Sequence, residues 1–172
     1  AAFVLRYAPT GYIYIVPFTW CPIITRVFYD SRTAIFIHII TTFIVSLVVP
    51  APFIFLLIQI LGGIVAVISL RDMTQRAQLA QTALFILLAY SLIYTAATLL
   101  IAGNITAVEY RYYFYFAINA VLVICSYGLI FLFERSFGLL SNITLVELTN
   151  VNSNLMLSFA EKAPGTFQHS LQ

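Results

Sequence analysis

Three polar side chains inside long apolar stretches of this sequence are the first candidates for chemistry: His38, Gln59 and Asn119. Polar groups at membrane depth are costly and often functional, so each could contact a ligand. His38 could in addition act as a proton-sensitive switch. The alternative is that each makes a hydrogen bond between helices, and we favour that reading for all three.

Other recognisable chemistry is missing from the sequence. There is no catalytic triad, P-loop or cysteine zinc motif, and Cys21 and Cys125 lie in apolar runs where a small thiol packs readily. No acidic pair falls within an apolar stretch, so transport is weakly supported. His169 has no second His or Asp beside it, and composition alone makes it an ordinary tail residue. We therefore expect no complete active site in this chain.

The composition places these candidates in a membrane protein. Of the 172 residues, 62% are hydrophobic and only 8% are charged, whereas soluble domains are usually about a quarter charged. The charges cluster at 26–32 and 71–76, which indicates loops separated by long uncharged segments. A net charge of +2 is too small and dispersed for a nucleic-acid-binding face.

Apolar runs of the length that crosses a bilayer recur along the chain. A hydrocarbon core of about 30 Å needs roughly 20 helical residues. The runs are continuously apolar, without the alternation of a lumen-facing strand. The sequence predicts an all-α polytopic membrane bundle over 1–133, with about five spanning helices and a short cytoplasmic helical tail. The spans lie near 12–28, 34–49, 52–70, 78–102 and 112–133.

Several local features refine this prediction. Pro17 and Pro22 should bend or break the first span unless neighbours satisfy the freed carbonyls, so it should be buried in the bundle. Gly62 and Gly63 should let two backbones approach closely. Asp30 or the following serine can cap the second span, and a salt link from Asp30 to a nearby arginine is also expected. Tyrosines suited to a headgroup belt follow the fourth span: Tyr110, Tyr112, Tyr113 and Tyr115.

The basic residues predict an orientation. Placing the 29–33 loop, the 71–77 loop and the C-terminal tail on one side leaves only Arg6 and Arg111 on the other side. Cytoplasmic loops carry the excess of Lys and Arg, so the first side is cytoplasmic and 103–111 face outward. The six basic residues on the cytoplasmic side are Arg26, Arg32, Arg71, Arg76, Arg135 and Lys162.

A polar connector is predicted over 134–165. Glu134 and Arg135 stand at the membrane exit, and the composition becomes rich in Ser, Asn and Thr after them. Thr144 and Glu147 have the spacing of a capping box, in which each side chain bonds the other's backbone N–H. These four residues are our candidates for signal coupling, because a capped helix following the last span could transmit tilt or rotation.

The tail also carries the most specific motif, Ala-Pro-Gly-Thr-Phe-Gln-His169-Ser-Leu over 163–171. Together with the 134–148 segment, it resembles the juncture between membrane region and catalytic domain in bacterial seven-transmembrane HD receptors, the PgpH-type cyclic-di-AMP phosphodiesterases. Upstream, Asp30-Ser-Arg32, Gly62-Gly63-Ile-Val-Ala66 and the turn from Arg71 to Leu79 also look like that family. One departure is Asn-Ser-Asn-Leu-Met at 152–156, where relatives often have Asn-His-Pro-Leu-Leu.

The resemblance implies a longer receptor in the bacterial inner membrane. Its parts are an N-terminal helix, an extracytoplasmic sensing domain, seven spans and a cytoplasmic HD phosphohydrolase that cleaves cyclic di-AMP with two metal ions, Mn or Fe. This chain would hold the last five spans, the connector and the first HD residues, 166–172. His169 corresponds to the family's first metal-binding His, and the other ligands would lie beyond Gln172. The fragment alone would then be neither an enzyme nor a holder of cofactors.

Two functions are therefore compared. The preferred one is a membrane sensor and anchor module whose partners are the bilayer, the rest of its own chain and, through the HD domain, cyclic di-AMP; homo-oligomerisation stays open. The alternative is a small-solute transporter or permease subunit, supported by helix count and the buried polar groups.

Overall fold

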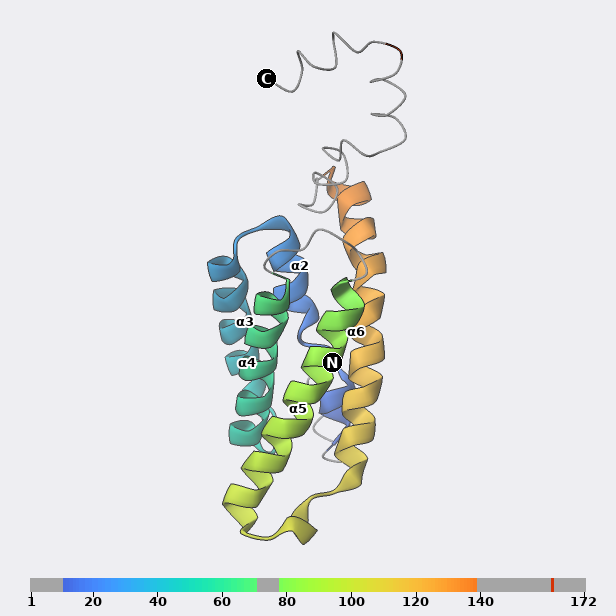
Figure 1. Cartoon of the computed structure of the whole chain (residues 1–172). Helices are drawn as coiled ribbons and strands as arrows, with labels where there is room; N and C mark the ends of the chain where they lie inside the picture. Colours follow the sequence, from blue (N-terminus) through green and yellow to red (C-terminus); the bar gives the residue numbers. More distant parts are fainter. Residues whose placement is uncertain (1–10, 71–77, 139–161, 163–172) are drawn as a thin grey trace.

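The computed structural model describes residues 11–70, 78–138 and 162, and the described part contains helices and no strands. Five α-helices run alongside one another (Figure 1). This architecture confirms the predicted all-α bundle. In chain order the elements are the 3-10 helix η1 (Tyr12–Ile15), α2 (Trp20–Phe28), α3 (Ser31–Ser46), α4 (Pro52–Ser69), α5 (Gln78–Ala102), the 3-10 helix η2 (Ile105–Ala107) and α6 (Tyr110–Phe137).

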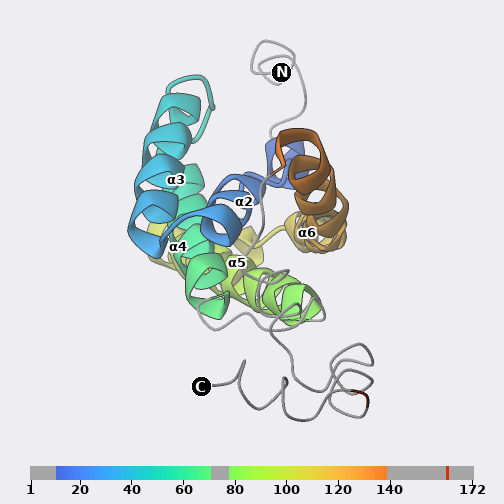
Figure 2. The same ribbon diagram turned by 90° about the horizontal axis from the view of Figure 1, so that it is seen from above.

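The four longer helices follow one another in a curved row, and α2 lies inside the curve (Figure 2). Each long helix contacts the next, from α3 to α4, α5 and α6. The short α2 contacts α3, α4 and α6, while η1 contacts α6. The first span is therefore interior, as its two prolines led us to expect.

Three helices, α4, α5 and α6, are long and apolar enough to cross a bilayer, whereas the first segment and α3 are shorter apolar helices. Large apolar side chains cover the outside of the bundle, with Leu92 71% and Phe36 64% exposed. Hydrocarbon rather than water accommodates such a surface. Together with the apolar composition, these helices make the chain a membrane protein.

The first span is broken where its prolines require. Residues 16–19 separate η1 from α2, and Val16 has an extended backbone. Pro17 lies in this break, while Pro22 occupies the first turn of α2, where a missing N–H costs no intrahelical bond. The predicted helix 12–28 is thus two shorter helices.

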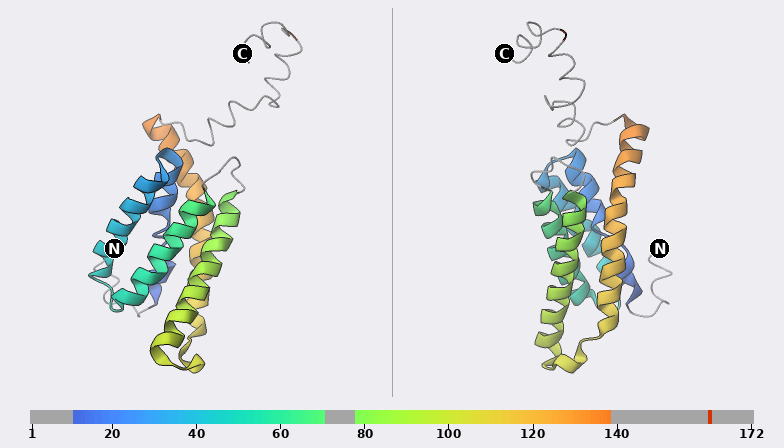
Figure 3. Two further views of the ribbon diagram at one scale, coloured as in Figure 1. Left: turned by 60° about the vertical axis from the view of Figure 1, so that its left-hand side comes forward. Right: turned by 45° about the vertical axis from the view of Figure 1, so that its right-hand side comes forward.

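The last span is longer than predicted. It begins at Tyr110 and continues to Phe137, four residues past the expected end at 133, until Gly138 closes it in the left-handed conformation with φ +62°. Glu134 and Arg135 are therefore part of α6. Twenty-eight residues correspond to about 42 Å of helix, more than the roughly 30 Å hydrocarbon core. At its C-terminal end α6 reaches beyond the other helices (Figure 3).

Asp30 is the N-cap of α3, as the sequence predicted. Its carboxylate accepts hydrogen bonds from the backbone N–H groups of Arg32 at 3.0 Å and Thr33 at 3.3 Å, and from the Thr33 hydroxyl at 2.5 Å. These bonds lower the pKa of Asp30 below its usual range, the Thr33 hydroxyl contributing most. Arg32 thus contributes its backbone N–H to the cap.

Candidate functional site

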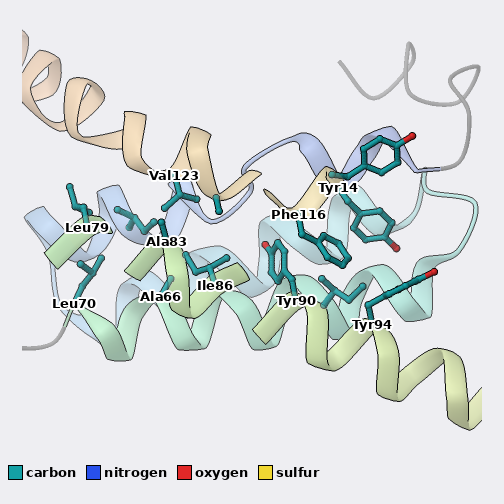
Figure 4. Close-up of a cluster of buried hydrophobic side chains, with 14 of the residues drawn as sticks. Tyr14, Ala66, Leu70, Leu79, Ala83, Ile86, Tyr90, Tyr94, Phe116 and Val123 are labelled. Atoms are coloured by element: carbon teal, nitrogen blue, oxygen red, sulfur yellow. The ribbon is translucent and has the colours of Figure 1, made fainter. Parts of the chain in front are cut away.

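The buried core joins aliphatic side chains at one end to an aromatic cluster at the other (Figure 4). Tyr14 of η1 meets Phe116 of α6 with ring centroids 5.8 Å apart, and Tyr94 of α5 stacks on Tyr112 at 4.6 Å. The predicted headgroup belt is therefore wrong in part. Tyr115 is buried against Tyr12, Tyr112 packs on Tyr14 of the broken first span, and Tyr113 packs on Tyr94 of α5. Of the four, Tyr110 stays outside, 86% exposed.

His38 and Gln59 lie together at the centre of the bundle. The His38 ring of α3 places Nε2 2.8 Å from the Gln59 main-chain oxygen of α4, and both side chains are buried. A carbonyl oxygen can only accept, so Nε2 carries the proton and donates it. The Gln59 side chain in turn accepts, through Oε1, a 2.6 Å hydrogen bond from the Tyr90 hydroxyl of α5. One glutamine thus connects three helices.

The adjacent glycines make room for these two partners (residues Gly62 and Gly63 of α4). A Cβ on Gly63 would collide with the His38 imidazole, and a Cβ on Gly62 would collide with the Tyr90 ring. The predicted close approach is confirmed, and each glycine serves a different neighbouring helix. Any larger residue would push His38 or Tyr90 out of hydrogen-bonding position.

Further hydrogen-bonding capacity surrounds this group. The Thr19 hydroxyl at the start of α2 lies beside that of Tyr90, and Thr42 follows His38 by one turn on the buried face of α3. Buried polar atoms normally find hydrogen-bond partners. Within the described part of the chain, the atoms without a hydrogen-bond partner in this region are Thr19 Oγ1, His38 Nδ1, Thr42 Oγ1 and Gln59 Nε2.

Asn119 of α6 satisfies the carbonyls that the break exposes. Its amide nitrogen lies 3.0 Å from the Tyr14 oxygen, 3.5 Å from that of Ile15 and 3.0 Å from that of Val16. On the other side of the break, Trp20 Nε1 donates to the main-chain oxygen of Leu122, also on α6, at 2.9 Å. The neighbour required by the broken first span is therefore α6.

The structure places the remaining candidates differently. Arg135 is exposed and Glu134 half-buried near the C-terminal end of α6. Thr144, Glu147 and His169 lie outside the described residues. Among the residues that are described, no group of three or more His, Cys, Asp or Glu side chains could hold a metal ion. The metal chemistry implied for an HD domain therefore has no ligand set in this part of the chain.

Sequence reasoning missed Tyr90, Thr19 and Trp20. Tyr90 lies within an apolar run of the sequence, although a phenol hydroxyl at membrane depth needs a partner as an amide does. Trp20 is the sole tryptophan of the chain, and its position just after Pro17 was an available signal.

Comparison with known proteins supports the family resemblance found in the sequence. A family model described as "7TM receptor with intracellular HD hydrolase" matches residues 1–141. The cyclic-di-AMP phosphodiesterase PgpH of Listeria monocytogenes serotype 1/2a (strain 10403S) is 30% identical over 166 residues, covering 92% of this chain and 23% of that protein. The protein of the same name from Bacillus subtilis (strain 168) is 28% identical over 117 residues, 65% of this chain and 16% of its own length.

The chain thus spans less than a quarter of either relative, and no solved structure matches it. The family model, in contrast, covers most of the chain and extends through the end of α6. The matched family is one of receptors, so the comparison favours the receptor function over the transporter alternative. This chain belongs to the family of seven-transmembrane receptors that carry an intracellular HD hydrolase domain.

Proposed function

We propose that this chain is the sensing and anchoring membrane module of a receptor that controls a cytoplasmic HD phosphodiesterase acting on cyclic di-AMP. The observation that carries the proposal is α6. This helix contacts η1, α2 and α5, is longer than the bilayer core, and ends at the segment that resembles the family's junction with the hydrolase. The names of the two relatives support cyclic di-AMP as the substrate of the whole protein.

The proposal includes an orientation. The C-terminal end of α6 and the 71–77 loop face the cytoplasm of a bacterial inner membrane, and the 103–109 loop faces outward. The distribution of arginines supports this orientation. The basic Arg135 in the last turn of α6 also suits the negative end of the helix dipole and the anionic inner leaflet.

His169 is proposed as the first of the ligands that hold the two metal ions, Mn or Fe, in the whole protein. A neutral imidazole binds such ions well, and bound metal lowers the pKa of a water for hydrolysis. The other ligands belong to sequence beyond this chain. The role of the chain described here is then to position that catalytic domain at the membrane.

The test uses the full-length protein in membranes supplied with manganese and cyclic di-AMP. His169→Ala should abolish most hydrolysis and lower the metal content, while the neighbouring Gln168→Ala should retain both. Equal hydrolysis by the two variants, with normal metal content, would assign the motif to the wrong histidine or the wrong enzyme class.

A further inference from the structure

The break in the first span is held on both sides by neighbouring turns of α6. Before the break, the carbonyls of Tyr14 and Val16 each lie 3.0 Å from the Asn119 amide nitrogen. After it, the Trp20 indole donates to the Leu122 oxygen at 2.9 Å. Asn119 and Leu122 are three residues apart, so they lie on neighbouring turns of the same face of α6.

The two contacts between α6 and the first span, at Asn119 and at Leu122, use different groups of α6. Asn119 contributes a side-chain amide, whereas Leu122 contributes a backbone carbonyl of the helix itself. A displacement of α6 relative to the first span therefore requires either that one of these bonds breaks or that residues 16–19 change their conformation. These residues are outside any regular helix, because Val16 is extended and Pro17 excludes a continuous helix.

The break, residues 16–19, has short-range backbone hydrogen bonds of its own. The short turn bonds inside it, from the N–H of Phe18 to the oxygen of Val16 and from the N–H of Trp20 to the oxygen of Pro17, are local. The next residue, Thr19, lies beside Tyr90 of the central polar cluster. The break is therefore bonded to α6 on both sides, and Thr19 within it lies beside Tyr90, which bonds Gln59 of α4.

We propose that Asn119 and Trp20 are positioning residues that fasten α6 to both sides of the break, so that the position of α6 and the conformation of residues 16–19 change together. This coupling would let a change among the inner helices reach α6, whose C-terminal end extends beyond the other described helices (Figure 3). The coupling itself is a property of the bundle. Only its consequence for a hydrolase rests on the proposed function.

Trp20 supplies a native reporter for the test. In the full-length protein in lipid nanodiscs, the indole 1H–15N signal of Trp20, assigned by its loss in Trp20→Phe, reports whether Nε1 is bonded. Asn119→Leu removes the hydrogen bonds from the Asn119 amide to the Tyr14 and Val16 carbonyls and leaves Trp20 in place. We expect the released population of the indole to rise about threefold to eightfold, the effect of losing one or two interhelical hydrogen bonds of average strength.

The matched control is Ser126→Ala. Ser126 is a buried polar residue of α6 two turns further along, and its hydroxyl has no partner in the described part of the chain. This control should leave the Trp20 signal unchanged. An unchanged signal in folded Asn119→Leu, or an equal change in Ser126→Ala, would overturn the proposal.

The reciprocal variant keeps the proposal testable if Asn119→Leu does not fold. Trp20→Phe retains an aromatic ring but removes the hydrogen bond from the Trp20 indole to the Leu122 oxygen. Coupling between two sites acts in both directions. It should shift and broaden the side-chain amide signal of Asn119, while the exposed-tyrosine control Tyr110→Phe should not. An Asn119 signal identical in the parent, Trp20→Phe and Tyr110→Phe would show that the Asn119 and Trp20 hydrogen bonds are independent, which would overturn the proposal.

Discussion

Replacing Gly63 by alanine tests the central packing of α3 against α4. A Cβ at this position would overlap three atoms of the buried His38 imidazole, and the ring could escape only by giving up its 2.8 Å bond to the Gln59 oxygen. Overpacking of this kind costs about 1–3 kcal/mol, and the lost interhelical hydrogen bond about 0.6 kcal/mol. The better helix propensity of alanine returns about 0.5–1 kcal/mol, leaving a net loss of about 1–3 kcal/mol.

The control is Gly128→Ala. Gly128 lies within α6, and a Cβ there would meet nothing within 4 Å. The same chemical change should leave that variant as stable as the parent, or slightly more so. Reversible unfolding in mixed micelles, titrated with SDS, gives the free energy of unfolding of both variants.

A double-mutant cycle separates the clash from a general effect of alanine. In a His38→Ala background the imidazole is gone, so Gly63→Ala should cost nothing there, and the coupling energy should account for most of the loss. Equal stability of Gly63→Ala and Gly128→Ala, or the same loss with and without His38, would refute the packing described here.

Four further outcomes are expected. Tyr90→Phe leaves Gln59 Oε1 without its 2.6 Å donor and should lower the free energy of unfolding by about 0.6–1.7 kcal/mol, whereas Tyr110→Phe, at an 86% exposed position, should have no effect in the same SDS titration. Asp30 has a lowered pKa from its cap bonds, so its contribution is present above the usual carboxyl range and is lost as pH falls through the folded-state pKa. The stability difference between the parent and Asp30→Asn should therefore shrink in acid, and a constant difference would show that the cap does not titrate. A membrane-impermeant thiol reagent should label Asn104→Cys but not Thr74→Cys in intact cells, and the reverse pattern would invert the proposed topology. Thr144→Ala should shift basal phosphodiesterase activity of the full-length protein without preventing membrane insertion, and an unchanged activity would make the predicted capped helix a passive tether.

Sequence alone predicted the features that depend on local signals. The fourth span was predicted to end at 102, where α5 ends, because Gly103 follows it in the sequence. Asp30 as a cap follows from its type and position before an apolar run. Pro17 predicted that the first span would bend or break, and the break at 16–19 is consistent with its rigid ring.

Tertiary partners could not be predicted in this way. Nothing in the sequence indicates that the Gln59 backbone meets His38 while its side chain meets Tyr90, because both contacts join different helices. The inward turn of Tyr112 and Tyr115 also depends on a neighbour, the broken first span, whose own tyrosines occupy that side. The charge of Glu134 predicts an end of the last span at 133, but α6 continues to Phe137, because a charged residue ends an apolar run without ending the helix.

The measurement that most directly tests the account is the rate of cyclic di-AMP hydrolysis by the full-length protein in nanodiscs, compared among the parent, Asn119→Leu and Ser126→Ala at equal metal content. If the membrane bundle controls the hydrolase through α6, Asn119→Leu should change the basal rate by about threefold or more, in line with the loss of one or two interhelical bonds, while Ser126→Ala keeps the parental rate. Equal rates in all three folded proteins would contradict the claim that this module regulates the catalytic domain.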